Sequence, residues 1–195
     1  MVILDNGLVA FVARDNNVPL VTLSVFIRGG KVDGQKEGAA EALAHAIEAS
    51  APSAALKRMT ARYTVALHDE WMEVSLNVPS EDIDEAFELF AKAVINPDIS
   101  QSNIDAAARQ ATATIATNDN GVIFDGNLNV AIAKFNDLLY QDHIYGKKLN
   151  QNDFASLSVS DISKFHQAYF VPGNMTIAVS GDIGRSAARM ALDEH

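Results

Sequence analysis

The chain has 195 residues, 48% of them hydrophobic, which is enough for one domain with a hydrophobic core. Its formal net charge of −10 disfavours binding to nucleic acids or anionic membranes, which requires clustered lysine and arginine, and no apolar run is long enough to span a bilayer. The absence of cysteine excludes disulfides, thiolate metal ligands and a cysteine nucleophile.

The first part of the chain alternates between strand and helix patterns. Every second residue from Val21 to Ile27 is aliphatic, which predicts a strand with one face in the core. A later alanine-rich segment predicts a helix that Pro52 ends, and Trp71 is expected to pack in the core. The predicted elements are strands at residues 8–13 (buried on both faces) and 20–28, a helix at 38–50, a short helical connection at 53–60, and paired strands at 62–67 and 71–78.

The second part is mainly helical. Ser80 and Ser160 are the expected N-caps of two helices, because a serine side chain can accept a hydrogen bond from the first turn. The predicted elements are helices at 80–96, 102–117 and 122–140, a loop at 142–150, a helix at 160–169, a strand at 174–180 and a helix from 185. This order predicts an α+β fold, with an antiparallel or mixed sheet and helices packed on one face.

The alanine-rich helix carries an unusual set of polar side chains. Glu41, His45 and Glu48 lie on one side of it, at i, i+4 and i+7. Burying such groups costs free energy unless they are paired or bound to metal. They form the one single-helix set with spacing suited to a metal ion. The alternatives are a hydrogen-bonded pair of His45 with a carboxylate, or a solvated helix face.

Five stretches follow one another in a specific order. They are Leu4-Asp5-Asn6-Gly7-Leu8, the helix with His45 and Glu48, the Asn96-Pro97 passage, Asp142-His143-Ile144-Tyr145-Gly146, and the stretch from Phe165 to Asp182. Together they resemble the N-terminal domain of the pitrilysin and mitochondrial-processing-peptidase family, the inverted zincins of peptidase family M16. The fold of that family, a sheet with helices on one side, agrees with the prediction from the sequence pattern.

Active members of that family hold a zinc ion with His-x-x-Glu-His and a glutamate from a later helix, and the glutamate within the motif is the general base. The resemblance places His45 at the first ligand position and Glu48 at the base. Ala49 stands at the second ligand position, and Ile115 stands near the position of the distal glutamate. One zinc ligand of three therefore remains.

No nearby residue replaces the lost distal ligand well. No glutamate lies between Glu88 and Glu194, so only Asp105 or Asp119 could substitute. The chain between Ser50 and Arg62 is also shorter than in active members, where the corresponding region lines the peptide cleft.

The resemblance therefore implies a non-catalytic subunit or domain, a pseudoenzyme with its zinc site lost. We expect it to pair with an active peptidase subunit, as a heterodimer, or with a second domain of the same family, and to help enclose a peptide or unfolded polypeptide. No cofactor is expected, although active relatives carry zinc. The alternative is an active zinc metalloendopeptidase with a rearranged site that uses His45, Glu48 and one of Glu41, Asp105 or Asp119.

We expect residues 1–195 to form a single domain that is a piece of a longer, multi-domain chain. The segment from Met1 to Gly7 lacks the pattern of a signal peptide. The composition is compatible with the periplasm or another non-cytosolic compartment.

Overall fold

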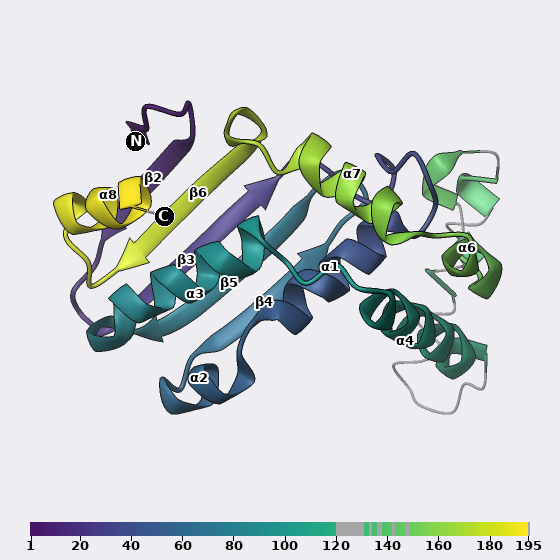
Figure 1. The fold of residues 1–195 in the computed structure, drawn as a ribbon, viewed down its shortest axis with the longest axis horizontal. Coiled ribbons are helices and arrows are strands. Elements are labelled where there is room, and N and C mark those ends of the chain that lie inside the picture. Colours follow the sequence, from purple (N-terminus) through teal and green to yellow (C-terminus); the bar gives the residue numbers. More distant parts are fainter. Residues whose placement is uncertain (120–130, 133, 136–137, 142, 147–148, 195) are drawn as a thin grey trace.

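The computed structural model describes residues 1–119, 131–132, 134–135, 138–141, 143–146 and 149–194. Its centre is a mixed sheet of six strands, seen from its helical side in Figure 1. The strands are β1 (Val2–Ile3), β2 (Val9–Arg14), β3 (Leu20–Ile27), β4 (Arg62–Leu67), β5 (Met72–Pro79) and β6 (Met175–Gly181).

The strand order is β1-β2-β6-β3-β5-β4, so strands from the two ends of the chain are neighbours in the sheet. The last strand, β6, lies between β2 and β3, parallel to β2 and antiparallel to β3. In the described sheet, β1 and β4 are the two edge strands. β4 pairs with β5 alone, in a register that runs from Arg62 opposite Asn77 to Leu67 opposite Met72.

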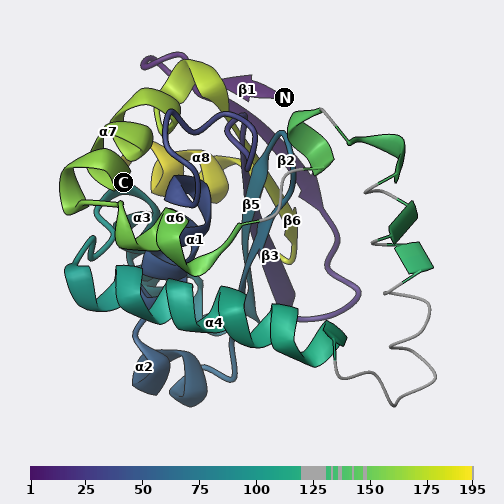
Figure 2. The same cartoon turned by 90° about the vertical axis from the view of Figure 1, so that its right-hand side faces the viewer.

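The helices gather on one side of this sheet, as Figure 2 shows for α1, α3, α7 and α8. The fold is therefore α+β, as predicted. The helices are α1 (Ala39–Ser50), α2 (Ser53–Arg58), α3 (Ile83–Ile95), α4 (Gln101–Asp119), α6 (Gln151–Ala155), α7 (Val159–Tyr169) and α8 (Arg185–Glu194), with short 3₁₀ turns at Ser80–Asp82, Ile144–Gly146 and Pro172–Asn174. None of them, within the described residues, has the length and apolar character needed to cross a membrane.

The core lies between the sheet and these helices. Alternate residues of β3 and β5 point into it, because successive side chains of a strand face opposite sides. All eight are at most 1% exposed: Val21, Leu23, Val25, Ile27, Met72, Val74, Leu76 and Val78. The alternation predicted for the second strand is confirmed.

Two predictions about burial in the sheet are wrong. In β2 only Ala10 is buried, and Phe11 is 49% exposed, because β2 lies near the sheet edge beside the two-residue β1. Trp71 precedes β5 by one residue and therefore points away from Met72 and the core. It packs instead against Phe26, with ring centroids 5.7 Å apart.

The predicted caps also differ. Ser158, not Ser160, caps α7: its side chain accepts a hydrogen bond from the Asp161 backbone, and the Asp161 side chain accepts one from the Ser158 backbone. Ser80 begins a 3₁₀ turn before α3 and makes no capping hydrogen bond through its side chain. Most of the predicted helix at 122–140 lies outside the described residues, and its described parts at 131–132, 134–135 and 138–139 are helical. Part of the predicted loop at 142–150 also lies outside them.

Candidate functional site

The candidate site is built on α1, whose start is fixed by a glycine. Gly38 has a backbone φ of 79°, a left-handed conformation that residues with a side chain rarely adopt. A Cβ atom there would also lie only 3.2 Å from a ring carbon of Phe154. The buried face of α1, including Leu43 and Ile47, packs into the core, while Glu48 and Ala49 are exposed.

A surface pocket of about 430 Å³ lies beside α1. It brings together all three polar residues that the sequence singled out on this helix. The pocket is lined by Glu41, Ala44, His45 and Glu48 of α1, Val65 and Leu67 of β4, Ala107 and Gln110 of α4, and Lys31. The three elements meet here because α1 packs against both α4 and β4.

His45 lies in this pocket without a partner for its inner nitrogen. Its Nδ1 atom is buried and has no hydrogen-bond partner among the residues that the structure describes. Within that part of the chain, Nδ1 therefore makes no hydrogen bond to a carboxylate, the pairing that was one alternative for His45. A buried polar atom left unpaired typically costs about 1–3 kcal/mol.

Burial affects the ionisation of two neighbouring groups. It raises the pKa of the Glu41 carboxyl, an effect that the backbone and the charge of Lys31 oppose. Tyr63 of β4 also has a raised pKa, chiefly through burial and secondarily through the charge of Glu48. Its hydroxyl donates to the carbonyl of Ile47 over 3.5 Å, which links β4 to α1.

The donor atoms present do not fit a catalytic zinc ion. A catalytic zinc needs about three protein ligands, and the described residues contain no group of three histidine, aspartate or glutamate side chains that could hold a metal. Ala49 has no donor atom. Asp105 lies outside the pocket lining and accepts a hydrogen bond from Gln101 of its own helix at 3.0 Å. Ile115 and Asp119 belong to α4, for which the structure describes the backbone but not these two side chains.

An unpaired strand edge borders the same pocket. In the described sheet β4 has β5 on one side and no strand on the other. Val65 and Leu67 of β4 line the pocket, so its outer edge runs beside Glu41, His45 and Glu48. Edge strands present free backbone N–H and C=O groups that can pair with another extended chain.

Several histidine and tyrosine side chains outside the α1 pocket make local packing contacts. His68 lies between β4 and β5 and stacks on Trp71 with ring centroids 3.8 Å apart. Tyr145, in the family-like loop, donates a hydrogen bond to Glu70 and packs edge-on against His143. These contacts link the loop to the turn before β5.

His166 of α7 contacts the earlier helix α3. Its Nε2 lies 2.9 Å from the carbonyl oxygen of Val94, and its ring stacks on Phe170. The contact ties α7 to the end of α3.

Sequence reasoning did not identify Lys31, Val65, Leu67, Ala107 or Gln110 as parts of the site. The alternation in residues 62–67 predicts which side chains share a face of β4, but not that β4 is an edge strand. Similarly, the pattern of α4 does not say which helix it meets. Both facts depend on contacts between distant parts of the chain.

Comparison with known sequences identifies a family. Residues 10–141 match the sequence profile of the family described as insulinase, peptidase family M16. No curated protein sequence gives a significant match.

Solved structures share the fold at low sequence identity. The inactive domain of an M16 peptidase from Pseudomonas fluorescens matches with a TM-score of 0.84 and 18% identity, over 97% of this chain and 48% of that one. A protease from Helicobacter pylori gives 0.83 and 19%, over 100% and 48%. The periplasmic protease PqqL from Escherichia coli gives 0.79 and 17%, over 98% and 23%. The chain thus spans about half the length of the first two structures.

Proposed function

Because the chain belongs to the insulinase family, peptidase family M16, we propose that it is a non-catalytic member that binds an extended peptide. The observation that carries this proposal is the combination of an open strand edge and a pocket without a zinc donor set. In this arrangement a peptide is held beside α1, and the residues that would activate a metal-bound water are incomplete.

The peptide would lie along β4 as an additional strand. Its backbone would pair with the free edge of β4, which gives affinity without regard to sequence. Every second side chain would then point toward the pocket, because side chains alternate along a strand. Val65 and Leu67 would flank such a side chain on one side and His45 on the other.

The charges of the pocket favour a basic side chain in the peptide. Glu41 and Glu48 bring two carboxyl groups to the lining, and Lys31 brings one ammonium group that already pairs with Asp69 at 3.5 Å. The net charge of −10 would in addition attract a basic peptide over longer distances. We therefore propose basic, unfolded segments as ligands.

An enclosed chamber requires a second body. The chain covers 48% of the structures from Pseudomonas fluorescens and Helicobacter pylori, so those proteins carry about as much additional chain again. We propose that this domain faces a second domain or subunit of the same family, one with an intact His-x-x-Glu-His, which supplies the catalytic zinc.

One observation favours the alternative of a rearranged active site. The buried Nδ1 of His45 has no hydrogen-bond partner among the described residues, and a metal ion that reached it would satisfy this atom. With Glu48 as a base, His45 would still need further ligands, for which Glu41, Asp105 and Asp119 are the candidates. Zinc titration separates the two functions, as argued at the end of the Discussion.

Peptide binding tests the proposal directly. Fluorescence polarisation should detect binding of a short, labelled, lysine-containing peptide. The Glu48→Lys variant should bind it about tenfold more weakly, since it places a like charge in the pocket. Glu88→Lys is the matched control: it makes the same change of charge on an exposed face of α3, outside the pocket, and should weaken binding far less.

A second control tests the strand geometry. The same peptide with N-methyl groups at alternate residues cannot donate backbone hydrogen bonds to β4 and should lose most of its affinity. Equal weakening by both charge variants, or full binding of the N-methylated peptide, would rule out a strand paired with β4 beside Glu48.

A further inference from the structure

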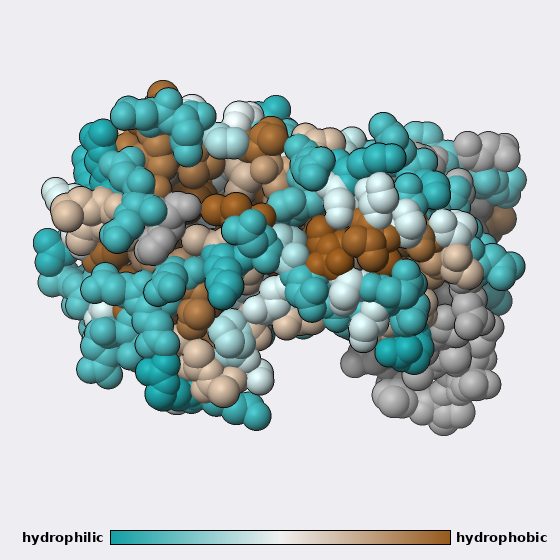
Figure 3. All heavy atoms as spheres, in the orientation of Figure 1, coloured by the Kyte–Doolittle hydropathy of each residue, from teal (hydrophilic) through white to brown (hydrophobic). Residues whose placement is uncertain are grey.

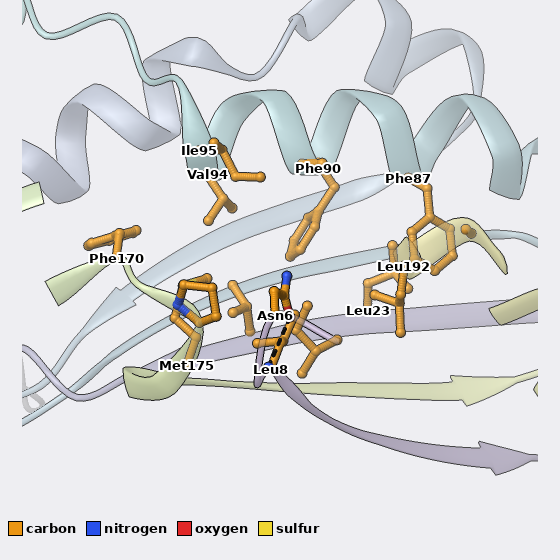
Figure 4. Close-up of a pocket in the computed structure, with 15 residues that line it drawn as sticks. Asn6, Leu8, Leu23, Phe87, Phe90, Val94, Ile95, Phe170, Met175 and Leu192 are labelled. Carbon is orange, nitrogen blue, oxygen red and sulfur yellow. Dashed lines mark hydrogen bonds between the residues drawn. The ribbon is translucent and has the colours of Figure 1, made fainter. Parts of the chain in front are cut away.

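A second cavity lies far along the sheet from α1, on the same helical side. It has a volume of about 220 Å³ and opens between α3 and α8. Figure 3 shows hydrophobic residues gathered on this part of the surface, beside α8 at the upper left. Figure 4 shows Phe87, Phe90 and Val94 entering it from α3 and Leu192 from α8.

The cavity is lined almost entirely by carbon. Its floor is formed by the sheet, with Leu23 and Ile177, and by Leu8, while Phe170 and Met175 close one end. The single polar side chain in the lining is Asn6, whose Oδ1 atom already accepts a hydrogen bond from the Leu8 backbone at 3.0 Å. A charged ligand would therefore lose its hydration without meeting a charged side chain among the lining residues.

Size narrows the class of ligand further. Apolar cavities of about 150 Å³ remain free of water and bind benzene, so about 220 Å³ holds a somewhat larger molecule. Phe87, Phe90 and Val94 are at most 6% exposed, whereas Ile95 at the rim is 49% exposed. The inner walls are thus fixed by core packing, and the mouth is open to an incoming molecule.

We propose that this cavity is a binding site for a small, uncharged, apolar molecule, an aromatic or alkyl compound of about eight to ten carbon atoms. The site is separate from the α1 pocket and does not depend on the proposed peptide binding. Occupancy would join α3 to α8 through the ligand, since both helices supply its walls. A bound molecule should therefore raise the melting temperature.

Ethylbenzene is the probe for this site, and phenylacetate is its charged counterpart of similar shape. Calorimetry should show saturable binding of ethylbenzene at one site and no binding of phenylacetate. Two variants fill the cavity from opposite walls, Ala191→Phe from α8 and Ala91→Leu from α3. Each should weaken ethylbenzene binding at least about tenfold.

Each filling variant has a matched control, in which the same new residue replaces an exposed residue next to it in the helix. Met190→Phe and Lys92→Leu change exposed positions of the same helices, outside the cavity lining, and should leave binding unchanged. Circular dichroism verifies that all four variants fold. The proposal is overturned if ethylbenzene does not bind the unaltered chain, if phenylacetate binds equally well, or if the control variants weaken binding as much as the filling variants.

Discussion

The start of α7 is held by a reciprocal pair of hydrogen bonds. Ser158 Oγ accepts from the Asp161 backbone at 3.3 Å, and Asp161 Oδ2 accepts from the Ser158 backbone at 3.0 Å. Lys36 also donates to Asp161 Oδ2, over 2.9 Å, and thereby ties α7 to the loop before α1. Mainly the Ser158 hydroxyl, and then Lys36, hold the pKa of Asp161 below its ordinary value.

Removal of this cap should cost measurable stability. Ser158→Ala should lower the free energy of unfolding by about 1 kcal/mol, because the first turn of α7 loses a side-chain acceptor. Ser160→Ala, two residues away on an exposed position of the same turn, should change it by less than about 0.5 kcal/mol. Urea unfolding of the two variants compares them. A larger loss for Ser160→Ala would mean that α7 begins two residues later than the structure places it.

Glu41 should lower stability at neutral pH. Burial raises the pKa of its carboxyl above the ordinary 4.5, so the folded chain holds this proton more tightly than the unfolded chain. The contribution of Glu41 to the free energy of unfolding is therefore greatest at a pH below its pKa in the unfolded chain. It falls as the pH rises through its pKa in the folded chain. Glu41→Gln removes the ionisation and should be more stable than the parent at pH 7, with the difference shrinking toward pH 4.

Urea unfolding across this pH range measures the effect. Glu48→Gln on the same helix is the control, and it should change stability little because its side chain is exposed. A Glu41→Gln variant that is no more stable at neutral pH would contradict the assigned burial of Glu41.

At the scale of elements, patterns with local causes were predictable. The period of two in β3 identifies its core face, and the composition of residues 38–50 gives both the helix α1 and the shared side of Glu41, His45 and Glu48. The order of strands and helices along the chain was sufficient to predict the α+β class, with the helices on one side of the sheet. Each of these inferences needs only neighbouring residues and the geometry of one element.

Features set by distant contacts were not predictable in the same way. The burial of β2 depends on its place near the sheet edge, and the open edge of β4 depends on the strand order. Whether α4 or another helix completes the α1 pocket is likewise a matter of tertiary packing. Trp71 has the opposite parity to the core residues Met72, Val74 and Leu76, so the alternation of β5 itself places its ring on the other side of the sheet.

The positions assigned to lost zinc ligands can be tested across α1 and α4, which pack together. The double variant Ala49→His and Ile115→Glu should bind zinc at least about tenfold more tightly than the parent, since it restores two of three donors. Ala49 is exposed, so histidine fits there without repacking the core. Calorimetry of the double and both single variants is the measurement. Unchanged affinity in the double variant would show that Ile115 is not the distal position.

At the scale of the whole molecule, one side of the sheet carries the helices, and two cavities with different chemistry lie along it. The α1 pocket carries charged side chains and borders the free edge of β4, whereas the cavity between α3 and α8 is lined mainly by apolar ones. The family fold is thus retained around a site whose metal donors are incomplete in the described residues. This combination supports our proposal of a role in binding and pairing, with catalysis supplied by another domain.

Titration of the metal-free chain with zinc at neutral pH, followed by calorimetry, tests this role most directly. With His45 as the one remaining family-type ligand, we expect no binding tighter than about micromolar, because a catalytic zinc site needs about three protein ligands. Loss of this weak binding in His45→Ala would leave the non-catalytic role intact. Stoichiometric binding in the nanomolar range would contradict it and would favour the rearranged metallopeptidase site.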